Sequence, residues 1–221
     1  MNDFVQFFSD SDPSSVSTSI KLMLLLTVLS LAPSILILMT SFARIVIILS
    51  FVRTALATQQ MPPNQVIIGL ALFLTFFIMA PTFQEVNEKA LTPLFNEDIT
   101  LEEAYESASV PFKEFMSKHT RQKDLELFLR YTEVERPESI NDIPLTIMVP
   151  AFALSEIKTA FQIGFMIFIP FLVIDMIVAS VLMSMGMMML PPVMISLPFK
   201  ILLFVLVDGW YLVMKSILQS F

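Results

Sequence analysis

The chain has no cysteine, only one histidine and little charge. Charged residues make up 15% of its 221 positions, against about 25% in soluble domains. Without cysteine there is no disulfide framework, no thiol nucleophile and no thiolate metal ligand. The four glycines are too scattered to form a phosphate-binding loop; they are Gly69, Gly164, Gly186 and Gly209. These absences exclude several common kinds of enzyme and redox protein.

Metal-binding and catalytic patterns are equally scarce. His119 has no metal-ligand spacing around it, so we expect an exposed side chain, no metal and no other cofactor. The serines lack a nucleophile elbow. Asp175 and Asp208 imitate an intramembrane aspartyl protease pair, but Asp175 lacks the glycine context of such sites. The sequence also has no basic patch with interleaved aromatics, so we expect neither an enzyme nor a nucleic-acid-binding protein.

Hydrophobic residues, in contrast, make up 56% of the chain. Several uncharged runs exceed the roughly 18 residues at which a membrane-spanning helix becomes the default interpretation; the runs are 22–43, 54–84, 159–174 and 176–199. The start, "MNDFVQFFSDSDPSSVSTSIK", lacks the basic beginning of a secretory signal, so we expect the N-terminus to be retained. The composition therefore predicts a polytopic membrane protein.

The net charge of −7 belongs to one segment. Between Phe83 and Pro144 there are fourteen acidic and seven basic residues, and the rest of the chain has six of each. This separation predicts four regions: a polar N-terminal tail (1–14), a first hydrophobic helical block (15–82), an acidic, water-exposed insert (83–144), and a second hydrophobic block (145–221). Within the insert we expect two or three short amphipathic helices.

Prolines set the expected helix boundaries, because proline lacks an amide hydrogen and clashes with the preceding turn. In the first block we expect a short helix ending at Pro33, a second over 34–57, and a third over 65–81 between Pro63 and Pro81. Pro150 and Pro170 should interrupt the second block. The fold class is all-α, with bent helical hairpins.

Seven ionisable residues lie within or beside the apolar runs: Arg44, Arg53, Glu156, Lys158, Asp175, Lys200 and Asp208. Charges at membrane depth are costly and usually face protein or water in pairs. A proton or ion relay is one interpretation; structural ion pairs, within or between subunits, are the one we prefer. Lys200 and Asp208 are spaced two helical turns apart, which favours a seam between helices.

A methionine-rich segment separates two parts of the second block. Gly186 is a preferred helix terminator, and Pro191 with Pro192 prevents helix continuation, so Met187 to Leu190 should form a short loop. Non-helical backbone at membrane depth must be buried in protein or line a cavity. Flexible, apolar methionine side chains suit an adaptable ring. The alternative is that they merely fill space, since seven of sixteen methionines fall between Met176 and Met194.

Three stretches resemble the FliP/SctR family, the flagellar biosynthetic proteins and their counterparts in virulence type III secretion. They cover both hydrophobic blocks: "SFARIVIILSFVRTALATQQMPPNQVIIGLALFLTFFIMAP", "SEIKTAFQIGFMIFIPFLVIDMIVASVLMSMGMMMLPP" and "LPFKILLFVLVDGWYLVMKSILQSF". The tail and the acidic insert do not carry the resemblance.

The resemblance implies a noncatalytic subunit of the flagellar type III export gate, in the bacterial inner membrane at the flagellar basal body. It implies a five-fold assembly of copies that forms, with FliQ and FliR, a conduit for unfolded flagellar subunits, and it implies FlhB and FlhA as further partners. The family's methionine gasket maps onto Met187, Met188 and Met189. The alternative is an ion-coupled transporter or proton channel that uses Glu156, Lys158, Asp175 and Asp208.

Overall fold

The structure is a computed structural model, and it describes residues 33–58, 60–132, 139–187 and 189–221, with four single positions between 23 and 30. Across these residues all regular structure is helical. The chain divides into two compact units, Met1–Ile37 and Leu38–Phe221. The helix expected before Pro33 lies outside the described residues.

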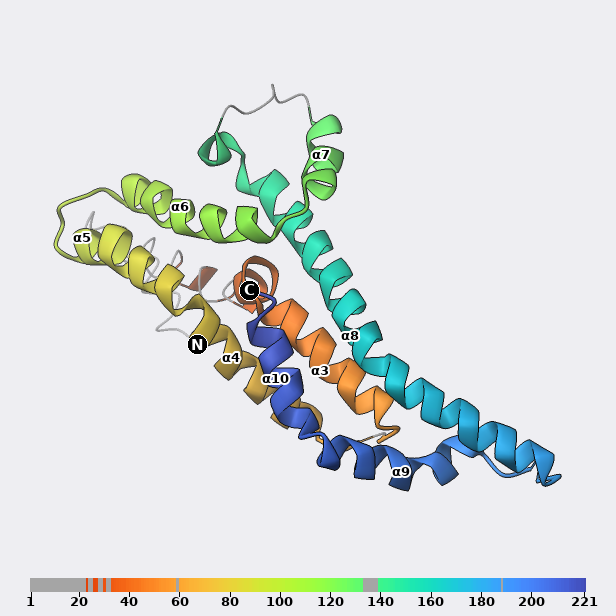
Figure 1. The fold of residues 1–221 in the computed structure, drawn as a ribbon. Coiled ribbons are helices and arrows are strands. Elements are labelled where there is room, and N and C mark those ends of the chain that lie inside the picture. The colour runs from red at the N-terminus through yellow and green to blue at the C-terminus, as the bar shows by residue number, and fades with distance from the viewer. Residues whose placement is uncertain are drawn as a thin grey trace, which may run out of the picture. The chain divides into compact units, whose positions relative to one another are not determined.

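The second unit is built of α-helices with two short non-α turns of helix (Figure 1). In chain order these are α3 (Phe42–Ala55), α4 (Asn64–Val86), the π-helix η1 (Asn87–Leu91), α5 (Thr92–Phe95), α6 (Leu101–His119), α7 (Gln122–Arg130), the 3-10 helix η2 (Ile140–Asp142), α8 (Leu145–Ser184), α9 (Pro192–Leu206) and α10 (Gly209–Leu218). The acidic segment (83–144) thus contains η1, α5, α6, α7 and η2 after the end of α4, more helical pieces than the two or three expected there.

Prolines begin helices as expected but do not end them. Pro63 is the N-cap of α4, which confirms the expected start. The predicted end at Pro81 is wrong, because α4 continues through Pro81 and, by way of η1 and α5, reaches Phe95. A proline inside a helix removes one hydrogen bond and displaces one carbonyl, and neighbouring helices can compensate for that loss in a membrane.

The expected interruption of the second block is also wrong. α8 runs for 40 residues with Pro150 and Pro170 inside it, a length of about 60 Å at 1.5 Å per residue. The single helix expected over 34–57 is in turn broken: a short helix, Pro33–Met39, stops before α3 begins at Phe42. At the break the Phe42 amide donates to the Thr40 hydroxyl, a side-chain bond that competes with the helical pattern.

Two hydrophobic clusters share α8. The cluster on its first turns joins it to the acidic segment, through Met116 of α6 and Ile147, Met148 and Phe152 of α8. The other cluster lies further along and joins α8 to α3, α4, α9 and α10. In Figure 1 α6 and α7 meet beside the first part of α8, and α9 returns beside its far half. α8 is therefore the element that connects the polar and apolar parts of the unit.

The contact between α3 and α8 depends on a glycine. A Cβ atom at Gly164 of α8 would lie 2.6 Å from Cγ of Phe51 and 3.0 Å from its Cβ. These atoms are close to the α3 backbone, so they cannot move aside as a flexible side-chain tip would. The helices approach closely because position 164 has no side chain.

Several of these helices are suited to a membrane. Two are long and apolar enough to cross it, Asn64–Phe95 and Leu145–Ser184. Two bent pairs also qualify if each pair is one span: Pro33–Met39 with α3, and α9 with α10, the latter bent by 65°. The chain is thus an all-α polytopic membrane protein with two to four spans by length and composition.

The tight α3–α8 crossing predicts that Gly164→Ala destabilises the protein, because over-packing typically costs about 1–3 kcal/mol. Gly69→Ala is the matched control, since a Cβ there meets nothing within 4 Å and alanine favours the helix. Thermal unfolding of the purified protein in detergent measures both. Equal melting temperatures for the two variants would contradict the close packing.

Candidate functional site

The methionine segment forms the tip of the α8–α9 hairpin. α8 ends at Ser184 and α9 begins at Pro192 with Pro191 as its N-cap, which confirms the expected loop between them. Gly186 has φ +74°, and its amide donates to the Met183 carbonyl. The Met187 amide donates to the Leu182 carbonyl, and together these bonds form a Schellman motif. The loop therefore leaves α8 in a defined direction.

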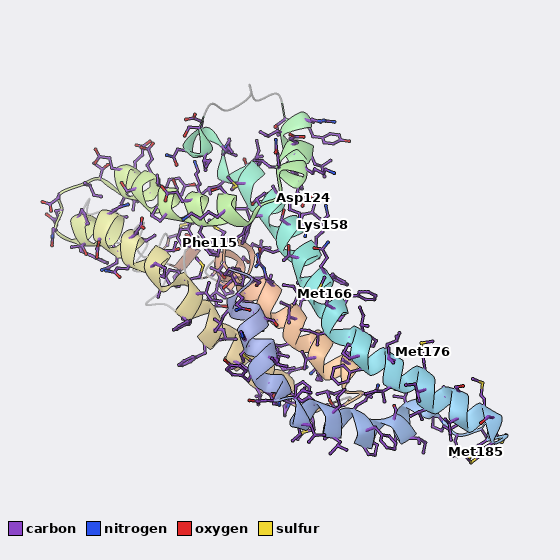
Figure 2. The ribbon with its side chains drawn as sticks, viewed as in Figure 1. Phe115, Asp124, Lys158, Met166, Met176 and Met185 are labelled. Carbon is purple, nitrogen blue, oxygen red and sulfur yellow. The ribbon has the colours of Figure 1, made fainter. Side chains whose placement is uncertain are left out.

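The described methionines of the loop point into open space. Met189 is 99% exposed and Met187 is 37% exposed, whereas Met188 lies outside the described residues. Met185, the C-cap of α8, and Met176, further back on the helix, are also exposed (Figure 2). Within the described chain, no side chain covers Met189, so its predicted function requires another molecule or another copy.

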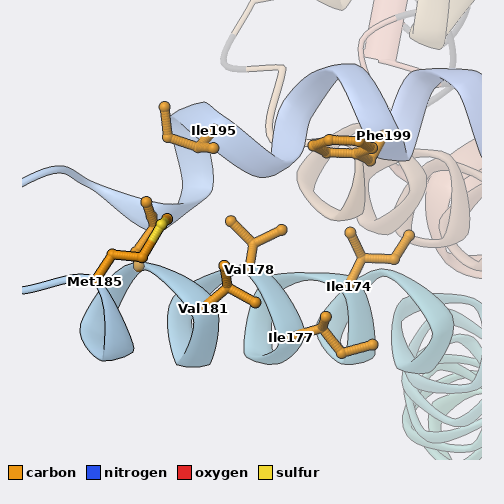
Figure 3. Close-up of a pocket in the computed structure, with 8 residues that line it drawn as sticks. Ile174, Ile177, Val178, Val181, Met185, Ile195 and Phe199 are labelled. Atoms are coloured by element: carbon orange, nitrogen blue, oxygen red, sulfur yellow. The ribbon is translucent and has the colours of Figure 1, made fainter. Parts of the chain in front are cut away.

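An apolar groove lies behind the loop, between α8 and α9 (Figure 3). It has a volume of about 490 Å³ and is lined by aliphatic, aromatic and thioether side chains: Ile174, Ile177, Val178, Val181, Leu182, Met185, Ile195 and Phe199. Because its lining offers no charged group, the groove is suited to apolar side chains or acyl chains and not to ions.

The most buried charge pair joins α3 to α8. The Arg44 and Glu156 side chains are 2% and 0% exposed and form a bidentate pair, in which Arg44 Nε donates to Glu156 Oε2 at 2.9 Å and Nη2 donates to Oε1. Such two-bond pairing with a carboxylate fits the planar guanidinium. The remaining Nη1 donates to the Ser220 carbonyl and hydroxyl. Every side of the buried cation thus has a partner.

The same arginine holds the end of α10 against the acidic segment. Its guanidinium carbon lies 3.8 Å from the centroid of the Phe221 ring, a cation–π geometry. His119 contacts that ring, with centroids 5.2 Å apart, and also Phe115. The expected exposure of His119 is therefore wrong: the side chain is half-buried. Burial, followed by the nearby Arg44 and Lys118 cations, lowers the pKa of His119 to about 4.

A second pair joins α8 to α9 near the loop. Lys200 is 2% exposed, and its Nζ donates to Asp175 Oδ2 at 2.6 Å. The Ser196 hydroxyl donates to the other carboxylate oxygen. Ser196 was missed by sequence reasoning, although its spacing of four residues from Lys200 put both on one helix face. This pair fixes the base of the hairpin that carries the methionine loop.

Of the third pair, only Lys158 was among the charges singled out in the sequence. Lys158 pairs with Asp124, a 2% exposed carboxylate on α7 that also accepts a hydrogen bond from Ser155 at 2.8 Å. Burial opposes ionisation of Asp124, but hydrogen bonds from Lys158 and Ser155 outweigh it and lower its pKa. Asp124 was missed because nothing distinguishes it from the other acidic residues of a charged segment.

Four of the seven charges are less buried than expected; one of them is Asp175, whose side chain is 24% exposed. Arg53 is partly exposed and donates to the amide oxygen of Asn64. Lys158 is 45% exposed despite its partner, and Asp208 is exposed. Their burial would have to come from other molecules. Asp208 also lies in a break beyond the end of α9, so the expectation that it shares a helix face with Lys200 is wrong.

The arrangement separates the acidic side chains instead of joining them. Asp175 meets Lys200 and not Asp208, so the structure assembles no aspartyl pair. The three ion pairs link different helix pairs: α3 with α8, α7 with α8, and α8 with α9. Among the described residues no group of His, Asp or Glu is arranged to hold a metal ion. The charges thus act as links between helices.

Helical spans, internal charge pairs and an exposed apolar hairpin tip define a polytopic membrane protein that acts with other molecules. The model of the FliP family matches residues 25–217. The chain is 76% identical to the flagellar biosynthetic protein FliP of Bacillus subtilis over the full length of both. It is 55% identical to that of Caulobacter vibrioides (91% of this chain, 76% of the relative) and 52% identical to that of Aquifex aeolicus (92% and 86%).

The chain therefore belongs to the FliP family. It is a membrane-associated component of the flagellar export apparatus, in which it acts together with other proteins of that apparatus.

The partly buried pair at the hairpin base predicts an asymmetry between single and double variants. Lys200→Met leaves Asp175 without its cation, and because that side chain is 24% exposed, the loss should be smaller than the about 3–5 kcal/mol typical of a fully buried pair. Lys200→Met combined with Asp175→Leu should recover most of that loss. Lys89→Met, at an exposed pair with Glu85, is the control and should change little. Thermal unfolding in detergent distinguishes these outcomes; a double variant as unstable as the single would refute the assignment.

The lowered pKa of His119 predicts a loss of stability in acid. The folded-state pKa of about 4 lies below the unfolded value of about 6.5, so the unfolded chain binds a proton first as pH falls. Stability contributed by the neutral imidazole is present above about pH 6.5 and declines toward pH 4. His119→Phe keeps a ring against Phe221 and should flatten this part of the melting-temperature profile. Parallel profiles of the two proteins would contradict the prediction.

Proposed function

We propose that this chain is a noncatalytic core subunit of the flagellar type III protein export gate. Several copies, five by analogy with the family, assemble with FliQ and FliR around a conduit for unfolded flagellar subunits. FlhB and FlhA are its further partners in the export apparatus. The site of action is the bacterial inner membrane, at the flagellar basal body. The loop Met187–Met189 forms the seal of the conduit.

One observation carries this proposal: an exposed methionine loop at the tip of a stiff, apolar hairpin. Met189 is almost fully exposed, and non-helical backbone in such an apolar setting is tolerated only against protein or a cavity. If several copies surround one axis, their loops form a ring. Methionine suits that ring because its three rotatable bonds and polarizable sulfur adapt to varied surfaces without a polar group.

The exposed apolar surface supports self-association. Only 11% of the most apolar window of α8 is buried within the chain, and the α8–α9 groove is open and apolar. The Schellman motif at Gly186 fixes the direction of the loop, while the Met189 side chain is 99% exposed. A fixed backbone with yielding side chains is what a reversible seal for polypeptides requires.

The charged residues support a structural role over ion transport. An ion pathway needs polar groups at its constriction, whereas the hairpin tip offers thioethers. Glu156 and Asp175, two of the residues expected in a relay, are each held by a cation within the chain. An ion-coupled transporter is thus the weaker alternative.

Replacing Met187, Met188 and Met189 together by alanine tests the seal. The change removes flexible apolar volume at every copy's loop, so the closed gate should hydrate and leak ions, while the ion pairs between helices still permit assembly. Leucine at the same positions keeps the apolar volume but loses flexibility, so it should seal at rest and pass substrates poorly. Membrane conductance and export of flagellar subunits are the measurements.

Met166→Ala with Met176→Ala is the matched control, because both residues are exposed on α8 away from the tip (Figure 2). This variant should remain tight to ions. An assembled alanine loop variant that stays tight and exports at the normal rate would identify the loop methionines as filler. A protein that exports nothing and conducts ions selectively would favour the transporter alternative.

A further inference from the structure

Two of the embedded charges, one of each sign, lack an oppositely charged partner within the described chain. Glu156, Asp175 and the missed Asp124 each hold a cation. The residues left over are the cation Arg53 and the anion Asp208; neither one forms an ion pair among the described residues. The two charges are therefore equal and opposite, but among the described residues of one copy they do not form an ion pair.

Arg53 is placed to meet an anion from outside. It lies in the last turn of α3 and is partly exposed. Among the described residues its guanidinium donates one hydrogen bond, to the neutral Asn64 side chain, which leaves four of the five guanidinium N–H donors for another acceptor. Its α3 neighbours Val52 and Ala55 are buried members of the main hydrophobic cluster.

Asp208 is placed to meet a cation from outside. It occupies the elbow between α9 and α10, with φ 51° and ψ 54° in the left-handed region, a conformation that is uncommon for a residue other than glycine. As the N-cap of α10 its carboxylate makes no capping hydrogen bond. Its neighbours Leu206 and Val207 are exposed apolar side chains. An unpaired carboxylate in an apolar surface calls for a cation from a partner.

We propose that Asp208 of one copy binds Arg53 of a neighbouring copy, and that this pair is a contact of the self-assembly on which the proposed function rests. The Arg53 of one copy gives the Asp208 of its neighbour the cation that it lacks. In the same contact that Arg53 gains the anion that it lacks. One contact surface carries Arg53 and the other carries Asp208, so repetition of the contact can close a ring.

The geometry is compatible with a shared interface. Val52 and Ala55 at the end of α3 belong to the same hydrophobic cluster as Phe204, near the end of α9. Each unpaired charge thus lies close in sequence to a buried member of this cluster. Lys215, the one cation of α10, is in the last turn of that helix; there the helix dipole stabilises it, about 10 Å along the axis from the elbow.

Thiol cross-linking tests the contact, because the natural sequence has no cysteine. Arg53→Cys and Asp208→Cys are placed on separate chains with different tags and expressed together. An arginine–carboxylate pair holds the two backbones further apart than a disulfide spans, so a short bismaleimide is the reagent. A covalent dimer carrying both tags is expected. The pairing of Arg53→Cys with Lys215→Cys is the matched control and should yield far less.

An amine-reactive cross-linker in the same membranes tests self-assembly separately from the Arg53–Asp208 contact. Multimers with that reagent but no mixed-tag product from the cysteine pair would overturn the Arg53–Asp208 contact and leave self-assembly intact. Multimers with neither reagent would overturn self-assembly itself. A cysteine at 208 that cross-links mainly to a protein of different mass would assign Asp208 to another partner and also overturn the contact.

Charge exchange supplies the independent test. Asp208→Arg and Arg53→Asp should each weaken self-association at least about tenfold, because each places like charges together. The double variant should restore assembly, since the pair is then reversed and not lost. The exchange of Lys89 with Glu85, an exposed pair on η1 and α4, is the control and should leave assembly unchanged. A double variant as defective as either single variant would overturn the contact.

Discussion

The buried pair between Arg44 and Glu156 is the interaction on which the rest of the unit depends. Removing two charges from water is costly, and their attraction offsets that cost only with excellent geometry and further hydrogen bonds. Here the guanidinium is bidentate, and it also contacts the Ser220 carbonyl and the Phe221 ring. Because α3, α8 and the end of α10 all meet at this cation, it fixes the positions of three segments that are distant in sequence.

α8 extends this alignment to the other helices of the unit. Its first turns pack against the acidic segment, its middle against α3, and its last turns against α9. Charge pairs occur along this length at Asp124–Lys158 and Asp175–Lys200 as well. Nondirectional apolar packing permits helices to slide past one another, whereas a charge pair in an apolar setting has one favourable position. The pairs therefore specify alignment more than they add stability.

The sequence predicts those features that depend on local chemistry and fails where tertiary contacts decide. Gly186 and Pro191 mark the hairpin tip correctly, because left-handed backbone and a missing amide act within a few residues. Pro81 did not end its helix, since one lost hydrogen bond is a small penalty beside the packing of a long apolar rod. Asp124 carries no local sign of burial; its role comes from Ser155 and Lys158, which are more than thirty residues away.

The tip of the α8–α9 hairpin and its two helices also differ in how their side chains are held. The charge pairs of α8 lie at Glu156, Lys158 and Asp175, all before the turns that lead into the loop. The Schellman bonds at Gly186 restrict the loop backbone. Met189, almost fully exposed, retains its rotamer freedom, which would be lost if it packed in a fixed core. For the proposed seal this means that exposed thioethers could adapt to chains of different shape without repacking the helices behind them.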